Sequence, residues 1–132
     1  MTEPTGRTRT KKEILHLEFE GLPPTVNMMY RGLQGHRYKT NACKKFQAGL
    51  QMALSLKYGD STPLEGCVEL DITFTTPSRR RWDIDNRVKA LQDCLAPSGV
   101  IQDDSQIDIL HVERRHGEFE NTGVTLCLLE EK

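Results

Sequence analysis

The sequence predicts a single α+β domain in which a mixed β-sheet packs against two main helices. Three observations favour this fold class. The 132 residues suit one compact domain that buries about two-thirds of its unfolded surface. Several short segments alternate apolar and polar residues, which is the period of half-buried strands. Two longer segments carry apolar residues at helical spacing instead.

Residues 1–13 are expected to form a flexible N-terminal arm, and residues 14–132 the folded domain. Thr2–Lys12 is polar and contains several basic residues, so it can trail across an anionic surface. From Leu15 to Phe19 apolar and polar residues alternate, which predicts the first half-buried strand.

A long loop and a long helix are predicted next. Gly21–Arg37 contains prolines and glycines, and a loop of this length in a small domain is usually functional. The helix begins at Thr40 or Asn41, either of which can cap it, and runs to about Tyr58. Its buried face is expected to be the apolar stripe Ala42, Phe46, Gly49, Leu50 and Ala53.

The second half of the chain contains a strand, a helix and a hairpin in this interpretation. Val68–Phe74 alternates and predicts a strand that ends at Pro77. The buried face of a second helix is marked by Val88, Leu91 and Leu95. Three polar residues occupy a different face of it: Asp85, Lys89 and Asp93. A final hairpin is predicted from Ile107–Arg115 and Val124–Leu129, joined by a loop at Gly117–Gly123.

Composition indicates an intracellular globular protein. The formal net charge is -1 and 36% of residues are apolar, whereas a disordered chain combines lower hydrophobicity with higher charge. No segment approaches the roughly 18 apolar residues of a membrane span, and Met1–Lys12 lacks the apolar run of a signal peptide. We therefore expect a cytoplasmic location. The 4 cysteines are far apart, which favours buried reduced thiols over a zinc knuckle or a disulfide scaffold.

Carboxylates around Lys89 outline a metal site. Asp83 and Asp85 flank one apolar residue, so their side chains fall on the same side of an extended segment. Lys89 follows Asp85 at i+4 and faces the same way on a helix. A third carboxylate, from Asp103 or Asp104, can return to the pair through a Pro-Ser-Gly turn. Such a cluster repels itself, which a bound divalent cation or partial protonation relieves.

Separate motifs in the chain occur in the order found in a known family. They comprise Arg79–Ala90, Asp103–Ile107 and His111–Glu113. These motifs resemble the RusA family of Holliday junction resolvases, because the Asp-x-Asp-Asn-x-x-Lys-Ala core and the spacing to the second aspartate of the Asp-Asp pair both match. The run from Pro23 to Arg31 also resembles the family's Pro-Pro-Ser-x-Asn-x-x-Tyr-Arg segment, with threonine at position 25 for the usual serine. The resemblance covers roughly residues 15–129 and leaves the arm out.

The resemblance implies a RusA-like fold and a homodimeric, Mg²⁺-dependent endonuclease that nicks two opposed strands of a four-way DNA junction. Carried over by position, the catalytic metal ligands are Asp83, Asp85 and Asp104, and the catalytic cation is Lys89. Spacing favours Asp104 over Asp103. Mg²⁺ prefers oxygen ligands and activates bound water, while a lysine can stabilise charge growing on the phosphate. Whether one or two ions bind stays open.

A set of polar residues is expected to bind DNA: Asn27, Tyr30, Arg31, Arg79, Arg80, Arg81 and Arg87. The arginine run lies beside the proposed cleavage site, which favours phosphate contact over an ordinary solvated charge run. A net charge of -1 is low for a DNA-binding protein, so basic residues must share one face while acids such as Glu118 and Glu120 lie elsewhere. We expect modest affinity for ordinary duplex and a preference for branched DNA.

Some alternatives remain at this point. Asn86 can orient a carboxylate or cap the second helix, and Asp93 can pair with Lys89, which leaves it outside the site. Two other functions are a catalytically silent protein that binds branched DNA and a metal-dependent hydrolase of small phosphate esters. The intact aspartate set argues against the first, and the arginine run argues against the second.

Overall fold

A computed structural model of the chain describes residues 8–31, 38–59 and 62–131, without the side chains of Tyr30, Arg31 and Tyr38. The strands are β1 Arg9–Glu20, β2 Tyr30–Arg31, β3 Tyr38–Lys39, β4 Val68–Thr76, β5 Ile107–His116 and β6 Asn121–Glu131. The helices are α1 Val26–Met29, α2 Asn41–Tyr58 and α3 Val88–Gln92. Single turns of 3-10 helix at Ile84–Arg87 and Asp104–Gln106 precede α3 and β5.

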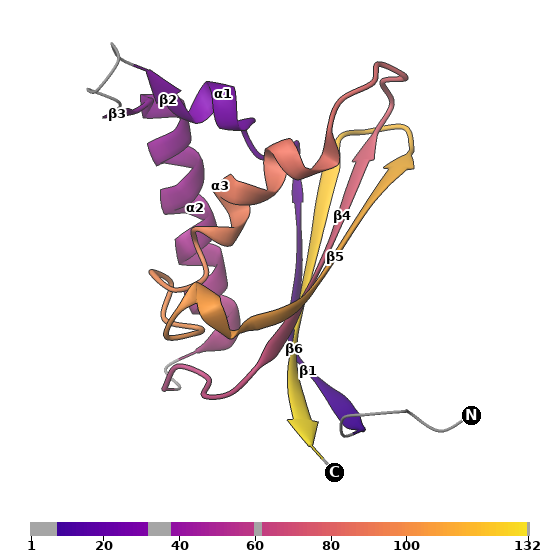
Figure 1. Cartoon of the computed structure of the whole chain (residues 1–132). Helices are drawn as coiled ribbons and strands as arrows, with labels where there is room; N and C mark the ends of the chain where they lie inside the picture. The colour runs from indigo at the N-terminus through magenta and orange to yellow at the C-terminus, as the bar shows by residue number, and fades with distance from the viewer. Residues whose placement is uncertain (1–7, 32–37, 60–61, 132) are drawn as a thin grey trace.

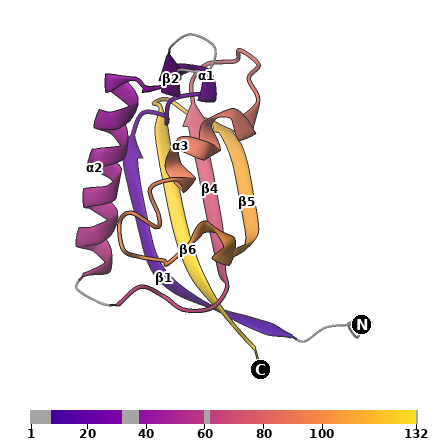
Figure 2. The same ribbon diagram turned by 60° about the vertical axis from the view of Figure 1, so that its left-hand side comes forward.

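The four long strands form one mixed sheet in the order β1-β6-β4-β5. β6 is antiparallel to both β1 and β4, whereas β5 is parallel to β4. Helices α2 and α3 cover one face of the sheet, and no described element covers the other (Figure 1). α3 crosses in front of the sheet while α2 lies along β1 (Figure 2). The predicted α+β fold, with a mixed sheet and two main helices, is confirmed.

The predicted final hairpin is wrong, because β4 lies between β5 and β6. β4 is buried along most of its length and needs hydrogen-bond partners on both edges, which β5 and β6 supply. The connection from β5 to β6 passes close to the end of β4, where the Gly117 amide donates to the Thr76 carbonyl. A Cβ at Gly117 would lie 2.5 Å from a methyl carbon of Thr75, so the crossing requires glycine.

The predicted boundary between the N-terminal arm and the folded domain, after residue 13, lies too far along the sequence. β1 begins at Arg9, and residues 9–13 pair in register with residues 127–131 of β6. These strand residues are exposed and mostly charged, so they lack the apolar alternation that marks a half-buried strand. Side-chain ion pairs accompany the backbone pairing, with Arg9 bonded to Asp108 and Lys11 to Glu69. Residues 1–7 lie outside the described part of the chain.

Helix α2 has the predicted bounds and cap. The Thr40 side chain accepts a hydrogen bond from the Cys43 amide, as an N-cap residue does. The predicted apolar stripe is only partly right, because Leu50 is buried whereas Ala42, Gly49 and Ala53 are exposed. The buried face is Cys43, Gln47, Leu50 and Leu54. Gln47 is buried because its amide has partners, donating to the Ala90 carbonyl and accepting from Lys39.

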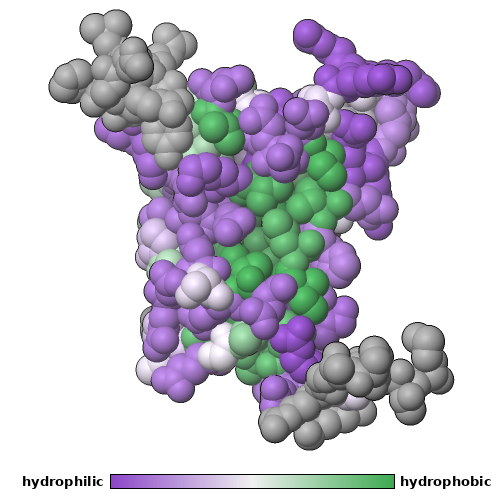
Figure 3. Space-filling model, in the orientation of Figure 1, coloured by the Kyte–Doolittle hydropathy of each residue, from purple (hydrophilic) through white to green (hydrophobic). Residues whose placement is uncertain are grey.

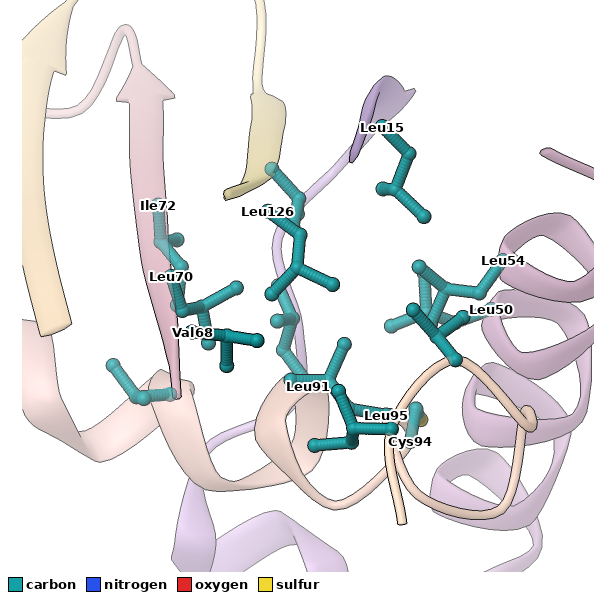
Figure 4. Packing of buried hydrophobic residues seen from close by; sticks show 14 of the residues in the cluster. Leu15, Leu50, Leu54, Val68, Leu70, Ile72, Leu91, Cys94, Leu95 and Leu126 are labelled. Atoms are coloured by element: carbon teal, nitrogen blue, oxygen red, sulfur yellow. The ribbon is translucent and has the colours of Figure 1, made fainter. Parts of the chain in front are cut away.

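The core lies between strands β1, β6 and β4 on one side and the two helices on the other, as Figure 4 shows. α3 ends at Gln92, earlier than predicted, and the chain continues in turns that still bury Cys94 and Leu95.

The expected loop at 21–37 contains α1 and β2 instead of being wholly irregular. All four cysteines are free thiols, three of them buried. None of the described helices is long and apolar enough to cross a membrane.

Candidate active site

Trp82 anchors the acidic segment that follows β4. The Arg87 and Arg114 guanidinium carbons each lie 5.2 Å from the centre of the indole ring, and Phe74 of β4 meets it edge-on at 5.7 Å. Arg114 of β5 also donates to the Trp82 carbonyl at 2.6 Å. The backbone immediately before Asp83 is therefore tied to both β4 and β5.

A hollow of about 470 Å³ lies between α3 and β5. Its charged lining consists of Asp85, Lys89, Asp93 and Asp104. Its apolar lining consists of Ile84, Val88, Leu110 and Val112. Figure 3 shows apolar surface on this side of the molecule, bordered by polar residues. The structure thus brings three of the four predicted catalytic residues to one pocket.

Asp103 and Asp104 have different surroundings. Asp103 caps the 3-10 turn, because its carboxylate accepts from the Ser105 amide and Gln106 completes a capping box. Asp104 lines the pocket, and its Oδ1 is buried without a hydrogen-bond partner. Burial raises the pKa of Asp104, the charges of Asp93 and Asp103 raise it further, and Lys89 lowers it. A buried carboxylate oxygen without a donor suits a hard cation such as Mg²⁺.

Asp83 does not line this pocket. The chain is extended at Asp83, but the 3-10 turn begins at the next residue, so the alternation that would place Asp83 and Asp85 on one side does not continue. Asp83 is exposed and its side chain makes no capping hydrogen bond. Among the described residues, ligand atoms of Asp83, Asp85 and Asp104 do not all lie within 4.8 Å of one another.

Lys89 pairs with Asp93, as the i,i+4 spacing indicated. Lys89 Nζ lies 3.2 Å from Asp93 Oδ2. Sequence reasoning left Asp93 outside the site, yet it lines the pocket, and after burial its charge is the largest cause of the raised Asp104 pKa. The i,i+4 relation to Lys89 was the signal that could have included it.

The residues predicted to bind DNA have different surroundings. Asn27 is exposed on α1, and the side chains of Tyr30 and Arg31 lie outside the described structure. Arg79, Arg80 and Arg81 are exposed on the connection after β4, which lies at the same end of the molecule as α1 and β2 (Figure 2). Arg87 stacks on Trp82 and donates to the Pro23 carbonyl at 2.6 Å, so it joins the α1 region to this segment.

The expected separation of acids from the arginine run is wrong in part. β4 and β5 are parallel and end side by side, with Thr76 in register with His116. The arginine run follows Thr76, and Glu118 and Glu120 follow His116, so both groups lie at this end of the sheet. Acidic side chains close to the arginines weaken the local attraction for phosphate.

The model of the family described as "Endodeoxyribonuclease RusA" matches residues 20–126, which include the whole pocket lining. The chain belongs to the RusA family.

Two curated RusA relatives are similar over most of the chain. Crossover junction endodeoxyribonuclease RusA of Aquifex aeolicus (strain VF5) is 31% identical over 108 residues, which cover 80% of this chain and 84% of the relative. Crossover junction endodeoxyribonuclease rusA of Enterobacteria phage HK97 is 29% identical over 93 residues, covering 70% and 76%. As a RusA member, the chain is an endodeoxyribonuclease.

Trp82→Ala is expected to lower the free energy of unfolding by about 2 kcal/mol or more, because it removes an aromatic contact and two cation–π contacts. Trp82→Phe keeps an aromatic ring there and should lose less. Urea denaturation followed by circular dichroism measures both variants. Equal stability of Trp82→Ala and the wild type would show that the packing around Trp82 does not support the fold.

Asp104 and Asp103 are expected to affect stability with opposite pH dependence in chelator-treated protein. The Asp104 pKa is raised, so its stabilising effect is complete below the unfolded pKa of about 3.9 and is lost as pH rises through the folded value. Asp104→Asn should therefore stabilise the metal-free fold at neutral pH. The Asp103 pKa is lowered by its hydrogen bonds to Ser105, so its contribution is present above the unfolded pKa and lost as pH falls.

Urea unfolding of Asp104→Asn, Asp103→Ala and the wild type, at neutral pH and near pH 3, measures this difference. Asp103→Ala should be destabilised at neutral pH and should approach the wild type in acid. A destabilised Asp104→Asn at neutral pH would mean that the buried carboxylate has a stabilising partner in the metal-free protein.

Proposed function

We propose that the chain is a Mg²⁺-dependent resolvase that cuts four-way DNA junctions by paired nicks, acting as a homodimer on recombination intermediates of a bacterium or phage. The observation that carries this proposal is the unpartnered, buried Oδ1 of Asp104 in a pocket that also holds Asp85 and Lys89. The names of both curated relatives support the junction as substrate. Asp83, assigned to the metal by family resemblance, stays a prediction.

Asp85 and Asp104 would hold the metal from two separate elements, the 3-10 turn before α3 and the 3-10 turn before β5. A bound Mg²⁺ would act as a Lewis acid and would lower the pKa of a bound water, which makes that water a better nucleophile toward phosphorus. Lys89 lies one helical turn beyond Asp85 and would bind the phosphate oxygens on which charge develops. Leu110 and Val112 form an apolar wall on one side of the pocket, and the lower local dielectric would strengthen these electrostatic interactions.

Exposed groups at the end of the molecule that carries α1 would position the DNA. Asn27 and the arginine run at 79–81 lie at this end and can contact phosphates, which fix orientation without reading sequence. One pocket per chain reaches one strand, so cutting two opposed strands requires two copies. A closed two-fold dimer matches the approximate two-fold symmetry of a junction.

Cleavage of three end-labelled DNAs tests the reaction: a four-way junction, a fork and a linear duplex, each with and without Mg²⁺. We expect Mg²⁺-dependent cleavage of the junction in preference to the duplex. Binding of the junction without cleavage in any divalent metal would favour a silent binding protein. Hydrolysis of a small phosphate ester without DNA selectivity would favour a phosphoesterase.

A supercoiled plasmid with an extruded cruciform tests paired cleavage. Wild-type protein should convert it to linear product, whereas mixed dimers of wild-type and Asp104→Asn subunits should yield nicked circles. Light scattering measures whether the dimer is present before DNA is added. Monomer at working concentrations, together with linear product, would contradict a preformed dimer.

A further inference from the structure

The uncovered face of the sheet carries a cluster of metal-ligating side chains that the proposed cleavage reaction does not use. Its members are Glu69 and Asp71 of β4, His111 of β5 and Cys127 of β6. Cys127 is in register with Glu69 across β4 and β6, and His111 is in register with Asp71 across β4 and β5. Because alternate residues of a strand share a face, these side chains gather on one side of three neighbouring strands.

The distances within the cluster are close to those of a metal centre. Ligand atoms of Glu69, Asp71 and Cys127 all lie within 4.8 Å of one another. His111 Nε2 lies 3.7 Å from Glu69 Oε1. A tetrahedral Zn²⁺ with bonds of about 2.0–2.3 Å separates its ligand atoms by about 3.3–3.8 Å, so shifts of about 1 Å would close these groups around an ion.

Burial distinguishes this cluster from ordinary surface acids. Glu69 is 2% exposed and Cys127 is 8% exposed, although no described helix or strand covers this face. The Cys127 thiol lies beside both carboxylates and has no hydrogen-bond partner among the described residues. A buried polar atom without a partner indicates a place where a ligand can bind.

The electrostatics of the cluster favour a cation. Lys11 Nζ already lies 3.0 Å from Glu69 Oε2, while Glu69 Oε1 faces His111. Burial raises the pKa of Asp71, and hydrogen bonding to Glu69 and the charge of Glu69 raise it further. Two carboxylates in contact are stabilised when a proton or a metal ion lies between them.

We propose that Glu69, Asp71, His111 and Cys127 form a Zn²⁺ site on the outer face of the sheet. Thiolate, imidazole and carboxylate ligands together suit Zn²⁺, whereas Mg²⁺ takes oxygen ligands alone. The bound ion joins edge strand β5 to β4 and β6. His111 lies between Leu110 and Val112 in the sequence, and these two residues line the pocket on the opposite face. The ion therefore holds in place the strand that forms one wall of the candidate active site.

Titration of the metal-free full-length protein with Co²⁺ tests the site, because Co²⁺ replaces Zn²⁺ and absorbs light. We expect one equivalent to give the visible bands of tetrahedral Co²⁺ and a near-ultraviolet charge-transfer band from the thiolate, both abolished by added Zn²⁺. Cys127→Ser should lose the charge-transfer band and bind Co²⁺ about tenfold or more weakly. Absence of the band in the wild type at millimolar Co²⁺, or its persistence in Cys127→Ser, would overturn the proposal.

Three further variants show whether the ion binds at this cluster or elsewhere on the protein. Cys67→Ser removes a thiol outside the cluster and should keep the band. The double variant Asp85→Asn, Asp104→Asn should also keep it, since the candidate active site lies on the other face. Lys11→Met removes the competing cation and should bind Co²⁺ more tightly. If Cys127→Ser fails to fold by circular dichroism, His111→Ala replaces a side chain that is 67% exposed, and its unchanged Co²⁺ affinity would overturn the proposal.

Discussion

Asp85→Asn and Asp104→Asn are each expected to lower Mg²⁺-supported cleavage of a four-way junction by about a thousandfold or more. A metal ion contributes several kcal/mol of transition-state stabilisation, and each 1.36 kcal/mol corresponds to about tenfold in rate. Binding of the junction should be retained or tightened, because each change removes one negative charge that repels phosphate. Single-turnover cleavage on labelled junctions, with gel-shift binding in EDTA, measures both quantities.

Asp103→Asn is the matched control for Asp104→Asn. It makes the same chemical change one residue away, and asparagine caps a helix as well as aspartate does, so the 3-10 turn should be kept. We expect Asp103→Asn to cleave at a rate near that of the wild type. The reverse order of effects would assign the ligand to Asp103. Asp83→Asn tests the remaining predicted ligand, and a loss as large as that of Asp85→Asn would mean that Asp83 reaches the metal when DNA binds.

Lys89→Ala is expected to reduce the cleavage rate by about a hundredfold to a thousandfold, which corresponds to about 2.7–4 kcal/mol. The loss should appear in the rate at saturating protein, with little change in junction affinity, because the proposed contact forms with charge that develops in the transition state. A loss of affinity with unchanged saturated rate would instead assign Lys89 to DNA positioning.

Two controls separate the charge of Lys89 from the ion pair that its removal also breaks. Lys57→Ala removes an exposed lysine in the last turn of α2, away from the pocket, and should leave the rate unchanged. Asp93→Asn breaks the ion pair with Lys89 but keeps the ammonium group. It should therefore cost less rate than Lys89→Ala does. An equal cost would mean that the ion pair, rather than the ammonium group by itself, supports cleavage.

Local patterns predicted the helices and strands of this fold better than they predicted which strands pair with one another. The cap at Thr40, the bounds of α2 and the alternation of β4 all depend on neighbours within a few residues, and each was confirmed. The pairing of β5 with β4 depends on residues about 40 positions apart in the chain, which periodicity does not report. The strand at Arg9–Glu13 was missed because its exposed charged residues bury no apolar face.

In the candidate site too, some positions could be predicted from the sequence and others depend on the folded structure. Motif spacing selected Asp85, Lys89 and Asp104, and the fold brings these three residues to one pocket. The position of Asp83 depends on where the extended segment gives way to the 3-10 turn, and residue spacing alone does not fix that boundary. A sequence signal did separate Asp103 from Asp104, because aspartate followed three residues later by glutamine is a capping-box pattern.

The sequence contains 1 tryptophan, and it immediately precedes Asp83. Trp82 also touches Arg87, which follows Asp85, and Arg114, which belongs to the pocket-forming strand β5. Tryptophan emission depends on the charges and polarity around the indole ring. The unlabelled protein therefore carries a fluorescent reporter beside its candidate active site, so that a stopped-flow instrument can follow metal and junction binding there before any strand is cut.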